Sequence, residues 1–122
     1  MIGSLMMCVS VLVLLAGMLA GIAMGIEQNF ALAPAHAHFN LVGGVLLFVF
    51  GLYYRLVPAA GASTLAKWQG WLHMIGGILF PAGVALVILK GETFIAAPIV
   101  GSLIVTAAMA LFAVIVFRTS RA

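Results

Sequence analysis

Charged residues are scarce in this sequence. Five residues are Lys or Arg and two are Asp or Glu, together 6% of a chain of 122 residues. A soluble domain carries about 25% charged residues, so this chain could not cover a water-facing surface with polar groups. Because 66% of the residues are hydrophobic, we expect an integral membrane protein. The few basic residues give no indication of nucleic-acid binding, and we expect no nucleic-acid partner.

Cysteine and β-barrel patterning are also missing or nearly so. The lone Cys8 cannot form a disulfide within the chain, and its apolar surroundings predict a packed thiol. The strict apolar–polar alternation of a transmembrane β-barrel is absent, since the apolar runs are continuous. A helical span needs ~20 apolar residues. We therefore predict an all-α integral membrane four-helix bundle that forms a single domain over residues 1–122, with spans at residues 2–26, 34–57, 65–89 and 94–117.

Glycine and proline mark the helices. Gly17, Gly21 and Gly25 share one helix face, which favours close approach of a neighbouring helix and a true span rather than a signal peptide. Pro34 is typical of a first helical turn, whereas Pro81 predicts a kink in the third span. Ser63 or Thr64 is expected to cap that span.

The basic residues predict the orientation in the membrane. Arg55, Lys67, Arg118 and Arg121 fall on one side of a four-span chain, and Lys90 falls on the other. The positive-inside rule then places both termini in the cytoplasm and the start of the second span near the outer face.

Two of the three histidines, His36 and His38, begin the second span. An intramembrane histidine is a functional hypothesis by default. Residues two apart in a helix point ~200° apart, so the pair should serve two neighbours rather than one metal. Asn40 shares a face with His36 and could support it, and Gly43 and Gly44 would leave room for something flat. Alternatively, both histidines lie at the water interface and bond loop carbonyls.

The third histidine suggests a second polar site. His73 lies early in the third span, and with Gln69, Tyr53 and Arg55 it could form a polar pocket near the inner face, for example for a quinol. The alternative is an interfacial histidine that bonds a neighbouring carbonyl.

The run from His36 to Pro58 contains His-Phe-Asn, paired glycines and the ending Gly-Leu-Tyr-Tyr-Arg-Leu-Val-Pro. It resembles the second helix of the catalytic subunit (subunit I) of haem-copper oxidases, closest to the branch of C-type oxidases and nitric oxide reductases. That subunit has twelve spans in three four-helix arcs around a pseudo-threefold axis. The resemblance covers this run and, loosely, the four-span layout.

The resemblance implies that each chain is one such arc and that three chains form a homotrimer. In the family a His-x-His pair ligates two different haems. This implies that His36 of one protomer and His38 of the next hold haem b between them, with copper as the alternative metal and with Asn40, Gly43 and Gly44 at the cofactor site. The implied function is cytochrome b-like electron transfer in a bacterial inner membrane, with a quinol or a cytochrome as electron donor.

One departure from the family weakens the case for oxygen chemistry. The adjacent histidine pair of the family's copper site has no counterpart, because residues 84–89 contain no histidine. Whether the protein is an enzyme stays open, and no catalytic residue is assigned. The alternatives are a haem or copper carrier or assembly partner, a small structural membrane subunit, and oxygen or nitric oxide reduction at an open haem or haem-copper site.

Overall fold

The computed structural model describes residues 1–121, and this part of the chain is helical without strands. Four of its helices are long and apolar enough to cross a membrane, which by length and composition indicates an integral membrane protein. The elements are α1 (Ile2–Glu27), α2 (Ala33–Asn40), the π-helix η1 (Leu41–Leu46), α3 (Leu47–Leu56), α4 (Pro58–Gly61), α5 (Thr64–Lys90), the 3₁₀-helix η2 (Glu92–Phe94) and α6 (Ala96–Thr119).

The ends of the four spans lie within two residues of the predicted ends. The Ser63 hydroxyl accepts a hydrogen bond from the Ala66 amide at 3.1 Å, which confirms the predicted cap and begins α5 at Thr64. At the far end, Gly91 adopts φ +95°, a backbone conformation that favours glycine and stops the helix.

Three local features differ from the expectations or refine them. α5 is one continuous helix across Pro81. The connection between the second and third spans, which lies outside the predicted helices, contains the helical turn α4, because Pro58 is suited to a first helical position. Cys8 is exposed on the surface of α1, so the prediction of a packed thiol is wrong. An apolar run does not show which of its residues face a neighbouring helix.

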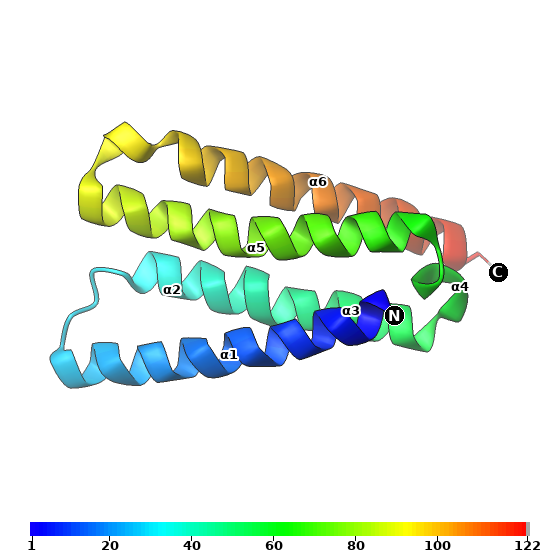
Figure 1. Ribbon diagram of the computed structural model, residues 1–122, viewed down its shortest axis with the longest axis horizontal. Coiled ribbons are helices and arrows are strands. Elements are labelled where there is room, and N and C mark those ends of the chain that lie inside the picture. Colours follow the sequence, from blue (N-terminus) through cyan, green and yellow to red (C-terminus); the bar gives the residue numbers. More distant parts are fainter. Residues whose placement is uncertain (122) are drawn as a thin grey trace.

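The spans lie side by side in chain order, with α1 and α6 at opposite edges (Figure 1). α1 packs along α2, η1 and α3, and this second span packs along α5, which packs along α6. The second span is the most enclosed, with 39% of its apolar window buried against 17% for the last span. Both termini and α4 lie at one end of the bundle, and α2 begins at the other (Figure 1).

The hydrophobic core lies toward the end that carries the termini. Its aromatic centre is Phe50 on α3, whose ring lies 4.2 Å from that of Phe112 on α6 and 4.8 Å from that of His73 on α5. The fully enclosed members of this cluster come from α1, α3, α4, α5 and α6. The core therefore fixes α3 firmly, whereas α2 packs on its neighbours outside this cluster.

Candidate functional site

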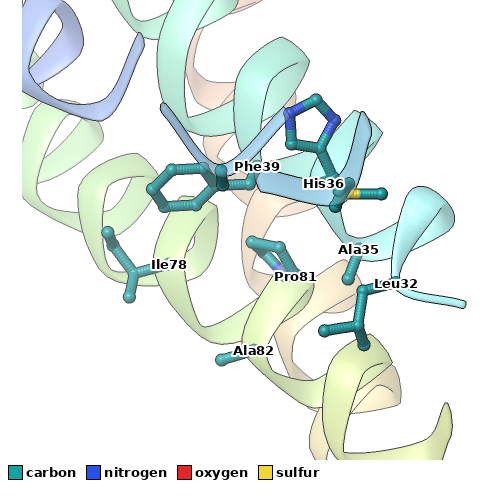
Figure 2. A pocket seen from close by; sticks show the side chains of 9 residues that line it. Leu32, Ala35, His36, Phe39, Ile78, Pro81 and Ala82 are labelled. Carbon is teal, nitrogen blue, oxygen red and sulfur yellow. The ribbon is translucent and has the colours of Figure 1, made fainter. Parts of the chain in front are cut away.

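A groove with a volume of about 370 Å³ lies between α1, α2 and α5. It is lined by Ala20, Met24, Leu32, Ala35, His36, Phe39, Ile78, Pro81 and Ala82. Figure 2 shows the Phe39 ring beside Ile78, with His36 at the edge of the same group and Pro81 among them. Small-molecule sites are commonly apolar cavities of ~300–1,000 Å³ with a few polar groups. An apolar groove that carries a single imidazole is of this kind.

His36 is half-buried and points from α2 toward α1. Its Nε2 lies 2.8 Å from the carbonyl oxygen of Gly17. Because a carbonyl can only accept, Nε2 must carry the ring proton to make this bond. Asn40 donates from Nδ2 to the His36 carbonyl at 3.1 Å and lies 3.0 Å from the ring nitrogen. The predicted shared face of His36 and Asn40 is therefore confirmed.

Two glycines of α1 make room for these side chains. A Cβ at Gly17 would overlap the Asn40 amide, and a Cβ at Gly21 would lie 3.2 Å from the His36 ring nitrogen. Gly25, by contrast, has no heavy atom of another residue nearby that a Cβ would meet within residues 1–121. The predicted glycine face is thus confirmed at two of its three positions.

His38 points to a different neighbour. Its Nδ1 lies 2.7 Å from the carbonyl oxygen of Pro34, so the ring proton sits on Nδ1 when this bond forms, and Nε2 keeps a lone pair. Its ring packs edge-on against Phe80 of α5, with the centroids 4.7 Å apart. His36 faces α1 and His38 faces α5, which confirms that the pair diverges. A ring whose N–H is held by a backbone carbonyl is typical of metal-ligating histidines.

The structure does not bring the two histidines to one metal. Within residues 1–121, no group of three or more His, Cys, Asp or Glu side chains is placed to hold a metal ion. Because His36 faces α1 and His38 faces α5, a site with both imidazoles on one ion would take them from two copies of the chain.

Gly43 and Gly44 do not leave the room that the sequence suggested. Both are buried in η1. A Cβ at Gly43 would lie 3.0 Å from the Gly77 carbonyl oxygen, and a Cβ at Gly44 would lie 2.5 Å from Leu14. α5 and α1 fill this space, so the expectation of a flat cofactor directly against these glycines is wrong within a single chain. The open space lies instead at the groove beside Ala35 and Phe39.

His73 lies inside the bundle rather than at the water interface. It is fully buried, and its Nε2 donates to the Val42 carbonyl at 2.8 Å, while Nδ1 has no partner within residues 1–121. The predicted bond to a neighbouring carbonyl is confirmed, and the interfacial position is wrong. His73 is buried although it lies early in its span, because α4 and the first turns of α5 form part of the core.

The other members of the predicted second polar site bond to different partners. Gln69 is fully buried on the face of α5 that also carries His73, and it accepts from the Tyr54 hydroxyl at 2.8 Å. The Tyr53 hydroxyl instead lies 2.7 Å from that of Thr119. Arg55 donates to Ser4 on α1 at 2.5 Å. These four residues do not share one pocket, because consecutive helical residues point in different directions.

Sequence reasoning missed residues that come from distant spans. Met24, Phe39 and Pro81 line the groove, and Ser10 on α1 donates to the Gly44 carbonyl at 2.7 Å from a fully buried position. Apolar groove residues carry no sequence signal, but a serine in the middle of an apolar span does. No protein-family model, curated protein or solved structure matches the chain.

Proposed function

We propose that the protein is a membrane haem-binding redox protein, cytochrome b-like and related to subunit I of the haem-copper oxidases. Haem b is held between His36 of one protomer and His38 of the next. The observation that supports this most is the His38 ring, whose Nδ1 proton is held by the Pro34 carbonyl so that Nε2 keeps a lone pair. Haem held by these two imidazoles would supply one-electron transfer rather than oxygen chemistry.

The surroundings of His36 fit the other half of such a site. The groove beside it is almost entirely apolar, as the faces of a porphyrin require. Asn40 holds the backbone beside this ring, since its Nδ2 donates to the His36 carbonyl. To ligate a metal through Nε2, His36 has to break its hydrogen bond to the Gly17 carbonyl. The His38 ring needs no such change, because its Nε2 already has a free lone pair.

The trimer is part of the same proposal. Within one chain His36 faces α1 and His38 faces α5, so the two imidazoles do not meet. By the resemblance to the oxidase subunit, three such four-helix arcs around a threefold axis would bring His36 of one copy to His38 of the next. We place the assembly in a bacterial inner membrane with both termini cytoplasmic, and a quinol or a cytochrome as the electron donor.

The test is an optical spectrum of the detergent-purified protein, oxidised and dithionite-reduced, with haem and metals quantified per chain. We expect a low-spin b-type spectrum with about one haem per chain. His38→Ala and His36→Ala should each abolish it. His73→Gln, which keeps a side-chain donor near the position of Nε2, should leave it unchanged. A wild-type haem spectrum in both alanine variants would refute the assignment.

The other outcomes separate the alternatives. Labile, substoichiometric haem or copper would favour a carrier or assembly partner. Copper without haem would place a metal site on the same imidazoles. A high-spin spectrum that responds to nitric oxide would indicate an open axial position and gas chemistry. A protein without cofactor after expression with excess haem and copper would be a structural subunit.

A further inference from the structure

The second span is interrupted by η1, six residues of π-helix between the histidine-bearing α2 and the core helix α3. π-Helical turns are rare and occur mostly as single turns inside α-helices, often at functional sites. The sequence of this segment, Leu-Val-Gly-Gly-Val-Leu, does not by itself favour one helix type. Its glycines and valines are only weak helix formers. Contacts from other helices must therefore select it.

Two buried donors reach η1 from the helices on either side. Ser10 of α1 donates to the Gly44 carbonyl at 2.7 Å, and His73 of α5 donates to the Val42 carbonyl at 2.8 Å. Both donor residues are 0% exposed. A serine in a helix commonly bonds a carbonyl of its own preceding turn, whereas Ser10 bonds across to another span. The Gly44 carbonyl also accepts from the Leu47 amide, so Ser10 adds a second donor from another helix to this irregular turn.

The backbone of η1 also meets α5 closely on the side of His73. A Cβ at Gly43 would lie 3.0 Å from the Gly77 carbonyl oxygen, and a Cβ at Gly77 would lie 3.3 Å from Gly43. This close approach brings the Val42 carbonyl within reach of His73. The two donors and the paired glycines therefore hold the same segment.

The π-turn sets the rotation of α2 relative to α3. It contains about one residue more than an α-helical turn, and one residue corresponds to ~100° of rotation and ~1.5 Å of rise. α3 is fixed by Phe50 and Tyr54 in the core. If η1 became α-helical while α3 stayed fixed, α2 would rotate by ~100° about the helix axis. His36 would turn away from Gly17 and the groove, and His38 would turn away from Phe80.

We propose that Ser10 and His73 are positioning residues for the candidate site. By donating into the carbonyls of η1, they hold the π-turn that directs His36 to the groove and His38 to its own face. This gives the third histidine a role that is not ligation. The inference concerns the site of the proposed function, but it can be tested on the protein without haem.

Thiol labelling of α2 tests it. In a Cys8→Ala background, Ala35→Cys and Ala37→Cys serve as reporters, because Ala35 is 6% exposed whereas Ala37 is exposed. With a membrane-permeant maleimide on protein in detergent, the Ala37→Cys thiol should react fast and the Ala35→Cys thiol slowly. Adding Ser10→Ala or His73→Leu should raise the rate at Ala35→Cys about tenfold relative to Ala37→Cys, as loss of one interhelical bond allows.

The matched controls keep a donor or remove an unrelated one. Ser10→Thr and His73→Gln should leave the labelling ratio at its wild-type value. So should Ser102→Ala, whose hydroxyl donates to Ile99 within α6. An unchanged ratio in Ser10→Ala would overturn the proposal, and so would an equal rise in Ser10→Thr. Ser10→Ala removes only the hydroxyl oxygen, so this variant is expected to fold. It therefore decides the test even if His73→Leu does not fold. Haem content plays no part in this readout.

Discussion

The polar side chains buried inside this bundle form hydrogen bonds between helices. Ser10, Gln69 and His73 are each 0% exposed. Ser10 joins α1 to η1, and His73 joins α5 to η1. Gln69 accepts from Tyr54 on α3 and donates to the Ala108 carbonyl on α6. Buried polar groups in a membrane are costly unless satisfied, and each of these three residues makes at least one hydrogen bond that joins two helices.

Removing the amide of Gln69 should destabilise the protein. Gln69→Leu leaves the buried Tyr54 hydroxyl without its acceptor and removes the side-chain donor to the Ala108 carbonyl, at a cost of roughly 1–2 kcal/mol. Adding Tyr54→Phe should recover part of this loss in a double-mutant cycle. The free energy of unfolding of each variant is measured by reversible unfolding in mixtures of detergent and SDS. Thr106→Ala is the control, since its hydroxyl bonds its own helix on an exposed face. Additive effects of the two core substitutions would show that the bond contributes nothing.

At the scale of the helix, the approach of α1 to α2 depends on a side chain being absent. Gly17 faces Asn40 and Gly21 faces His36. The candidate site therefore depends on α1 as much as on the helix that carries its histidines.

Gly17→Ala should separate α1 from α2, because the added methyl group would overlap the Asn40 amide. Overpacking of this kind costs about 1–3 kcal/mol. Gly25→Ala, one turn from Gly21, meets open space. It should be neutral or stabilise by up to about 1 kcal/mol, since alanine favours a helix over glycine. The same unfolding experiment compares them, and equal effects would contradict the packing described here.

The ends of the spans could be predicted because local chemistry decides them. Pro34 suits a first helical turn, and Ser63 caps α5 with its own hydroxyl. The shared face of His36 and Asn40 follows from helical spacing in the same way. The π-helix could not be predicted, since donors on α1 and α5 hold it. For the same reason the sequence predicts open space at Gly43, although the Gly77 backbone lies against it.

At the scale of the whole molecule, the basic residues follow the helix ends. Arg55 is near the end of α3, Lys67 is in the first turn of α5, and Arg118 is in the last turn of α6, whereas Lys90 ends α5. The end of α3, the start of α5 and the end of α6 lie where both termini lie, and the end of α5 lies where α2 begins (Figure 1). The positive-inside rule predicts that the first end faces the cytoplasm.

Topology reporters test this orientation. A fluorescent protein that folds only in the cytoplasm should be active when fused to either terminus. A periplasmic phosphatase should be active when inserted in the turn at Gly91. Activity of the phosphatase at a terminus would invert the orientation and move the histidines to the cytoplasmic face.

The groove itself belongs to this largest scale. Met24, Phe39 and Pro81 come from three different spans, and each is an ordinary apolar residue in its own sequence context. Sequence reasoning found the imidazoles because histidine is rare here, but the apolar walls around them exist only once the helices are packed.

The extra residue in η1 determines what the deletion of a single codon would do to the second span. Deleting one in-frame codon within residues 41–46 would make the second span a continuous α-helix while α2 and α3 keep their facing. Deleting one codon within α2 instead would swing everything before it by ~100°. Three nucleotides are therefore enough to preserve or redirect the histidine pair without altering either histidine codon.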